Sequence, residues 1–199
     1  MNIAVLCSGN GTNLQAIIDS VKSGYVPAKI ALVVSDNKSA FSLTRARTAG
    51  IETFVLDPKD FKTREEFDKE VVKNLKKKDV GLVVLAGFMR IISPYFIKEY
   101  KNRIINIHPA LLPSFKGTRG IKDALDYGVK VTGPTAHFVD EKLDNGPIIL
   151  QAAVEVKGDD TEEALSQRVH KAEHRIYPEA IKFFVEGRLK IEGRRVKIL

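Results

Sequence analysis

Residues 2–13 read NIAVLCSGNGTN, and the order of residue types in this stretch indicates the architecture of the chain. The first six residues are almost continuously apolar, as in a strand buried on both faces of a parallel sheet. Two glycines follow, and residues 12–23 then carry apolar side chains at helical spacing until Gly24 ends the pattern. A buried strand, a glycine loop and a helix in this order predict the beginning of an open α/β sheet.

Strands and helices continue to alternate after this first pair. We expect further strands at residues 29–35, 52–55, 80–86, 103–107, 131–139 and 147–156, and further helices at residues 40–49, 64–77, 120–127 and after Pro94. The link between the last two strands is too short for a helical crossover, which favours antiparallel pairing. A helix over residues 161–186, which Pro178 is expected to kink or split, and a hairpin over residues 189–199 follow. The predicted fold class is α/β, one domain with a mixed, mainly parallel sheet and helices on both faces.

The composition is that of a globular protein. With 199 residues, 44% of them hydrophobic and 29% charged, the chain is long enough for one substantial core. No apolar run reaches membrane-spanning length and no secretory leader is recognisable, so we expect a cytoplasmic protein without a membrane partner. The single cysteine, Cys7, excludes an internal disulfide and a cysteine-based zinc site, and its place after an apolar strand predicts a buried, unreactive thiol.

The net charge of +7 and a pair of histidines each raise a question about ligands. The basic residues are mostly dispersed among acids at helical spacing, as in residues 62–78, and no zinc finger or RNA-binding signature accompanies them. We therefore expect no nucleic-acid partner, and a small phosphorylated ligand suits the charge equally well. His170 and His174 have the i, i+4 spacing of a metal pair, but Lys171 stands where zinc proteases carry an acidic residue. We expect no metal site.

The glycine loop at residues 8–13 is a candidate anion site. Its two glycines let backbone N–H groups close around an anion, and the N-terminus of the following helix adds a positive dipole. The spacing matches neither the dinucleotide motif nor the Walker motif, so it predicts a phosphate without implying NAD or ATP. The alternative is an ordinary glycine turn in which Thr12 caps the helix.

A second group of polar residues follows the strand at residues 103–107. Asn106 and His108 are two residues apart, so an extended chain directs both side chains to the same face, and Pro109 ends the strand there. Asp144 is the candidate partner, because a nearby carboxylate favours the imidazolium that donates a proton near neutrality. The amide of Asn106 is a candidate donor to a developing oxyanion. The alternatives are a histidine that caps a strand and an Asp-Asn-Gly hairpin turn.

Two further features are open to more than one interpretation. The apolar glycine loop at residues 86–92, AGFMRII, follows a buried strand, where it can receive a flat ring or hold core residues. His137 lies in the middle of a predicted strand, and we interpret it as a structural histidine rather than a catalyst.

Four segments together closely resemble the phosphoribosylglycinamide formyltransferases, members of the folate-dependent formyltransferase family: SGNGTN at 8–13, LAGFMR at 85–90, NIHPALLP at 106–113 and LDNGP at 143–147. The resemblance covers essentially the whole chain, in order. It implies one formyltransferase domain over residues 1–199, with a Rossmann-like, phosphate-binding half at about 1–100, a folate-binding and catalytic half at about 101–199, and a sheet of seven strands.

The implied reaction transfers the formyl group of 10-formyltetrahydrofolate to the amine of glycinamide ribonucleotide in purine biosynthesis. These small molecules would be the partners of a monomer or homodimer, and no metal would be needed. By matching positions, the implied catalytic residues are Asn106, His108 and Asp144, and the implied contacts of glycinamide ribonucleotide are Gly11, Thr12, Asn13 and Glu173. The implied folate contacts are Arg64, Met89, Arg90, Ile91, Ile92, Asn106, Val139, Asp140 and Glu141. A phosphate contact from His170 or Lys171 is left open.

Three positions depart from the family pattern. Arg119 stands where a histidine is common, so the resemblance assigns it no role. Pro134 and Ala136 replace better strand formers, and we expect a local edge or bulge there.

Two kinds of rival function remain. A formyltetrahydrofolate hydrolase or another folate-dependent formyltransferase, such as methionyl-tRNA formyltransferase, would share the Asn, His and Asp residues. A noncatalytic nucleotide- or RNA-binding α/β domain would suit the charge and leave those residues unexplained.

Overall fold

The computed structural model describes all 199 residues, and its backbone forms two compact units, Met1–Ile105 and Asn106–Leu199. Both units contain strands of one mixed, mainly parallel sheet together with α-helices. The predicted α/β class is therefore confirmed. The prediction of a single functional domain with a phosphate-binding and a catalytic half stays a prediction.

The first unit contains four parallel strands: β1 (Asn2–Leu6), β2 (Lys29–Ser35), β3 (Thr53–Val55) and β4 (Val80–Leu85). Their order is β3-β2-β1-β4, so the chain moves outward from β1 and then crosses back to its other side. Nearly every residue of β1 and β4 is buried, as their continuous apolar runs predicted. The reversal between β1 and β4 is the place where open α/β sheets bind ligands.

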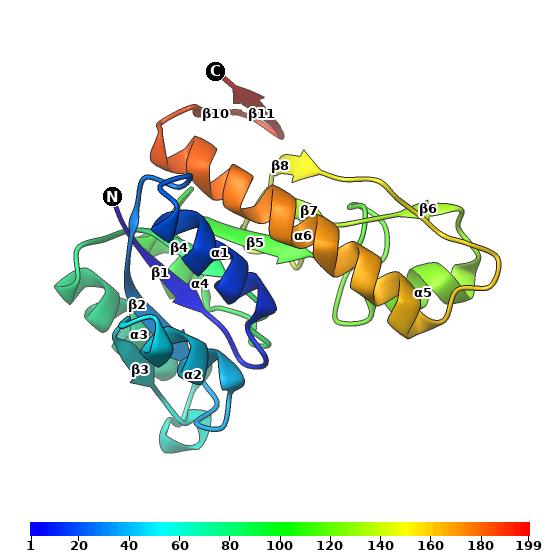
Figure 1. The fold of residues 1–199 in the computed structure, drawn as a ribbon. Coiled ribbons are helices and arrows are strands. Elements are labelled where there is room, and N and C mark those ends of the chain that lie inside the picture. The colour runs from blue at the N-terminus through cyan, green and yellow to red at the C-terminus, as the bar shows by residue number, and fades with distance from the viewer. The chain divides into compact units, whose positions relative to one another are not determined.

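The helices of the first unit follow from this strand order (Figure 1). Because parallel crossovers are right-handed, α1 (Thr12–Lys22) and α2 (Phe41–Thr48) cover one face of the sheet. After β3 the chain moves across the sheet in the opposite direction, and the right-handed crossovers therefore place α3 (Arg64–Lys77) and α4 (Pro94–Glu99) on the other face. A short 3-10 helix, η1 (Pro58–Asp60), precedes α3.

The second unit is less regular. Its part of the sheet has the order β5-β7-β8-β11-β10, with β5 (Ile104–His108) beginning in the first unit. The remaining elements are β7 (Thr135–Phe138), β8 (Ile148–Gln151), β10 (Leu189–Glu192), β11 (Arg195–Ile198), the helices α5 (Gly120–Tyr127) and α6 (Glu162–Val185), and a separate pair of short strands, β6 (Val131–Thr132) and β9 (Val154–Glu155). A cluster of buried residues that includes Leu165 and Val169 of α6 forms a core in this unit.

The structure corrects three expectations. The sheet has nine strands rather than seven, because the C-terminal hairpin joins it where Arg195 of β11 pairs with Ile148 of β8. The strand predicted at residues 131–139 is broken at Gly133, whose φ of 142° and close approach to the Ala152 carbonyl interrupt the extended chain. Its partner at residues 147–156 is broken likewise, so β6 pairs with β9 and β7 with β8. The helix α6 runs through Pro178, so it is not split there, and the kink that was the other expected outcome stays a prediction.

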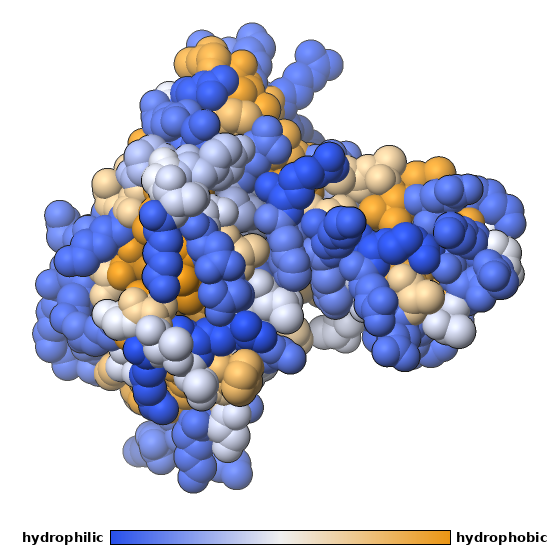
Figure 2. Space-filling view, viewed as in Figure 1, coloured by the Kyte–Doolittle hydropathy of each residue, from blue (hydrophilic) through white to orange (hydrophobic).

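The pairing of β7 with β8 shifts register between Ala136 and His137, so the local bulge predicted for this segment is present. No helix of the protein is both long enough and apolar enough to cross a membrane. On the face drawn in Figure 2, hydrophilic side chains are dispersed over many elements rather than gathered on one.

Candidate active site

Asn106 and His108 lie at the end of β5, and the chain turns away at Pro109. His108 is only 3% exposed, although its strand ends there. Such burial of an imidazole requires polar partners within the protein.

Both ring nitrogens of His108 face oxygen atoms. Nε2 lies 2.8 Å from the carbonyl oxygen of Phe115, and Nδ1 lies 3.5 Å from Oδ2 of Asp144. A carbonyl oxygen can only accept a hydrogen bond, so Nε2 carries a proton. The other ring nitrogen, Nδ1, faces the carboxylate of Asp144, so these two oxygen atoms fix the orientation of the imidazole ring.

His137 has the opposite arrangement. Its Nδ1–H donates to the carbonyl oxygen of Phe138 at 2.8 Å, so Nε2 is free to accept from Nδ2 of Asn106 at 3.3 Å. Burial lowers the pKa of His137, partly offset by this backbone hydrogen bond and by the charge of Asp144. The environment thus keeps His137 neutral, and the ring orients the amide of Asn106.

Asp144 belongs to the turn between β7 and β8. Its φ of 45° is unusual for a residue with a side chain, and the N–H of Gly117 donates to its Oδ2 at 2.9 Å. Asn145 anchors the same turn by donating to Oδ2 of Asp140 at 3.0 Å. Gly146 is required, because a Cβ there would lie 1.8 Å from the Phe138 carbonyl oxygen. The turn aims the carboxylate of Asp144 at both His108 and His137, whose Nε2 lies 3.8 Å from Oδ1.

The second unit thus brings together the three residues expected to be catalytic. One imidazole, one carboxylate and one oriented amide form an arrangement suited to stabilising an oxyanion and moving a proton. From the sequence, His137 is interpreted as a structural histidine, without its hydrogen bond to Asn106, and the Phe115 carbonyl is missed. The signal for His137 is a polar side chain in the middle of a strand of mostly apolar residues, whereas nothing in the sequence marks a backbone carbonyl.

The glycine loop of the first unit has the geometry of an anion site. Gly11 precedes α1 with a φ of 75°, and no side chain caps the helix, so Thr12 does not have the capping role considered as the alternative. A Cβ at Gly11 would lie 2.6 Å from Cβ of Ser42, which explains the glycine. The N–H groups at a helix N-terminus suit an anion, and Thr12 and Asn13 are the first two residues of α1.

The loop after β4 lies beside this glycine loop. The N–H of Ser8 donates to the Gly87 carbonyl at 3.0 Å, and the N–H of Met89 donates to Oγ of Ser8 at 2.9 Å. Met89 and Ile91 are 70% and 60% exposed. Exposed apolar side chains at the carboxyl end of a parallel strand suit the face of an aromatic ligand.

The remaining expected contacts are distributed over both units. Arg64 begins α3, Ile92 is buried, and the guanidinium of Arg90 stacks 4.5 Å from the Phe67 ring centroid. In the second unit, Val139, Asp140 and Glu141 follow β7 in the connection to β8.

Glu173 is buried in α6 and accepts from Nδ1 of His170 at 2.9 Å. This hydrogen bond raises the pKa of His170, against a smaller opposing effect of burial. His170 is therefore engaged with Glu173, and Lys171, the other residue considered for phosphate, is exposed. Arg119 pairs with Asp123 and Asp126 on the surface of α5.

Cys7 is buried and free, and burial raises the pKa of its thiol to about 11. The thiolate is the nucleophilic form, so this cysteine is unreactive, as its position predicted. The protein contains no group of three or more His, Cys, Asp or Glu side chains placed to hold a metal ion.

Comparison with known proteins identifies the family. The sequence profile described as formyl transferase matches residues 1–181, and the chain belongs to this family. The phosphoribosylglycinamide formyltransferase of Escherichia coli is 47% identical over 191 residues, which are 96% of this chain and 90% of that protein.

Two further relatives extend the comparison. The trifunctional purine biosynthetic protein adenosine-3 of Drosophila melanogaster is 47% identical over 187 residues, and the match covers 93% of this chain but only 14% of that protein. The crystal structure of glycinamide ribonucleotide transformylase 1 from Symbiobacterium toebii superposes with a TM-score of 0.99 at 51% identity, covering 100% of this chain and 94% of that one.

Proposed function

We propose that the protein transfers the formyl group of 10-formyltetrahydrofolate to the amine of 5-phosphoribosylglycinamide, a step of de novo purine biosynthesis. The products are formylglycinamide ribonucleotide and tetrahydrofolate. The observation that carries the proposal is the His108–Asp144 pair with the amide of Asn106 beside it, in a chain of the formyl transferase family.

His108 and Asn106 stabilise the negative charge that develops on the formyl oxygen when the amine attacks the formyl carbon. Nε2–H of His108, which now donates to the Phe115 carbonyl, donates to this oxygen instead. Asn106 has two amide hydrogens, so it can donate to the oxygen and to His137 together.

Asp144 keeps His108 charged and handles the proton of the reaction. The attacking amine must lose a proton and the departing folate nitrogen must gain one. Asp144 relays this proton through water, because its carboxylate, 3.5 Å from Nδ1 of His108, can accept a proton and return it. No step requires a metal.

Loops of the first unit are proposed to bind the other parts of the substrates. Gly11, Thr12 and Asn13 hold the phosphate of 5-phosphoribosylglycinamide at the N-terminus of α1, and Glu173 of the second unit accepts from ribose hydroxyls. The folate contacts are Arg64, Met89, Arg90, Ile91, Ile92, Asn106, Val139, Asp140 and Glu141.

The proposal includes a cytoplasmic location and no macromolecular substrate. The buried free thiol of Cys7 is compatible with a reducing compartment. A monomer or homodimer suffices, because all the proposed catalytic residues come from one chain.

The decisive experiment measures loss of the formyl group from 10-formyltetrahydrofolate with and without 5-phosphoribosylglycinamide. We expect rapid turnover only when the acceptor is present, with stoichiometric formylation of its amine. Glycinamide riboside, which lacks the phosphate, is the matched control and should be a much poorer acceptor. An equal rate without acceptor would identify a hydrolase, and no folate turnover at all would favour a binding domain.

A further inference from the structure

Two charged side chains outside the proposed site hold its substrate loops in shape. We propose that Arg45 of α2 is a positioning residue for the phosphate loop, residues 8–13, and that Asp68 of α3 is a positioning residue for the folate loop, residues 86–93. The inference rests on the proposed function of these two loops, and each residue is supported by its own set of contacts.

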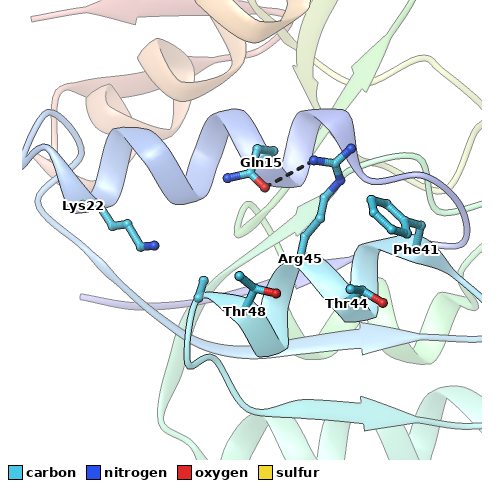
Figure 3. Close-up of a pocket in the computed structure, with 7 residues that line it drawn as sticks. Gln15, Lys22, Phe41, Thr44, Arg45 and Thr48 are labelled. Carbon is cyan, nitrogen blue, oxygen red and sulfur yellow. Dashed lines mark hydrogen bonds between the residues drawn. The ribbon is translucent and has the colours of Figure 1, made fainter.

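Arg45 clamps the phosphate loop with three of its nitrogens. Nε donates to the Asn10 carbonyl oxygen at 2.9 Å, Nη2 donates to Oδ1 of Asn10 at 2.9 Å, and Nη1 donates to Oε1 of Gln15 at 3.3 Å. Figure 3 shows Arg45 reaching from α2 toward Gln15 of α1, beside the ring of Phe41. The guanidinium stacks 4.9 Å from the centroid of that ring.

The carbonyl groups of Ser8, Gly9 and Asn10 in the loop are all engaged by donors from outside it. The Ser8 carbonyl accepts from Asn37 Nδ2, the Gly9 carbonyl accepts from the Ser42 N–H, and the Asn10 carbonyl accepts from Arg45. A carbonyl oxygen facing a phosphate would repel it, so a loop whose carbonyl oxygens are each held by a donor is preorganised for an anion. Arg45 supplies the only charged donor in this set, and its positive charge further favours an anion nearby.

Asp68 fixes the far end of the folate loop. It is only 2% exposed, and its Oδ2 accepts from the N–H of Ser93 at 2.5 Å. Ser93 is itself buried and caps α4 by accepting from the N–H of Phe96 at 3.4 Å. Since Gly87 and Met89 are tied to Ser8 at the other end, the loop is held at both ends.

The surroundings of Asp68 explain how a carboxylate remains in this position. Burial raises the pKa of Asp68, while Ser93 and the positive charges of Arg90 and Arg64 oppose the rise. Both arginines are proposed folate contacts. Asp68 therefore constrains the loop backbone through Ser93 and attracts the two cations that flank it.

Steady-state kinetics with each substrate varied separately tests the assignment. We expect Arg45→Met to raise KM for 5-phosphoribosylglycinamide by about tenfold or more with little change in kcat, because it removes charged hydrogen bonds without touching the reacting atoms. Arg45→Lys keeps the positive charge but cannot make all three hydrogen bonds of the guanidinium, so its KM should lie between those of the wild type and Arg45→Met. Asp68→Ala should raise KM for 10-formyltetrahydrofolate instead, and Asp68→Asn, which keeps an acceptor for Ser93, should do so less.

Each variant has a matched control on its own helix. Arg47 of α2 and Glu70 of α3 are surface residues away from both loops, so Arg47→Met and Glu70→Ala should leave both KM values unchanged. Unchanged KM values in Arg45→Met or Asp68→Ala, or equal rises for both substrates, would overturn the assignment.

Phosphate binding separates this inference from the proposed function. Titration of the ¹⁵N-labelled protein with inorganic phosphate should shift the amide signals of residues 11–13, and Arg45→Met should need about tenfold more phosphate for the same shift. If the wild-type protein shows these shifts but transfers no formyl group, the proposed reaction fails while the role of Arg45 stands. Identical titrations of wild type and Arg45→Met would remove that role.

Discussion

The two compact units of this protein build their candidate functional groups in different ways. In the first unit, the phosphate loop lies within residues 8–13 and uses backbone N–H groups at the start of one helix. In the second unit, the catalytic group consists of side chains from β5, β7 and the turn before β8. Backbone-based binding is encoded by neighbouring residues, whereas side-chain catalysis depends on segments that only folding brings together.

Replacement of His108 has the largest expected effect and tests the second unit directly. We expect His108→Ala to lower turnover by roughly 10²- to 10⁴-fold, because it removes both the oxyanion donor and the partner of Asp144. The KM for 5-phosphoribosylglycinamide should change little, since the proposed phosphate site is elsewhere. Kinetics at saturating substrate, with circular dichroism to verify folding, provide the measurement. Turnover near the wild-type value would exclude His108 from catalysis.

Gly146, in the turn that carries Asp144, and Gly9, in the phosphate loop, should differ in how well they tolerate replacement by alanine. Gly146→Ala is expected to destabilise the protein by roughly 3 kcal/mol or more, because the new Cβ would lie 1.8 Å from the Phe138 carbonyl oxygen and force the backbone to move. Gly9→Ala is the control, since a Cβ at Gly9 meets nothing within 4 Å. Urea unfolding monitored by fluorescence measures both. Equal stability of the two variants would contradict the close packing of the turn around Asp144.

His137 allows a pH test of the same cluster. Burial lowers its pKa in the folded protein below the ordinary value of 6.5, so the unfolded chain binds a proton at a higher pH than the folded one. Stability should therefore decline as the pH falls below about 6.5, and His137→Gln should weaken that dependence. Denaturation midpoints at pH 7.5 and pH 5.5 give the comparison. His137→Leu, which has no acceptor, should lower turnover by about tenfold, because the amide of Asn106 then loses its hydrogen-bond partner.

The N-caps of α3 and α6 should contribute equally to the stability of the protein, and their replacement has the smallest expected effect. Oγ1 of Thr63 accepts from the N–H of Glu66 at the start of α3, and Oγ1 of Thr161 accepts from the N–H of Ala164 at the start of α6. We expect Thr63→Ala and Thr161→Ala each to cost about 1 kcal/mol of stability without altering kinetics. Thermal unfolding measures both, and a much larger loss in one variant would show that its helix end has a tertiary role.

Local signals predicted most of the elements. The helices α3 and α5 and the strand β2 have the predicted bounds, because their apolar periodicity, Thr63 as the N-cap of α3 and Gly128 after α5 act over a few residues. The breaks at Gly133 and at residues 152–153 were not predicted, since they follow from the approach of two distant segments. The hairpin at residues 189–199 was predicted, but its place in the sheet depends on a single pairing with β8.

The sequence by itself determined the α/β class, the glycine loop at the start of α1 and the identity of Asn106, His108 and Asp144 as candidates, because each has a local pattern and a family resemblance. Only the tertiary structure decided that His137 is neutral and orients Asn106, that the Phe115 carbonyl faces His108, and that Arg45 and Asp68 hold the two loops. The physical reason is separation along the chain. The protonation and orientation of a side chain depend on atoms that are distant in the sequence and become neighbours only when the backbone folds.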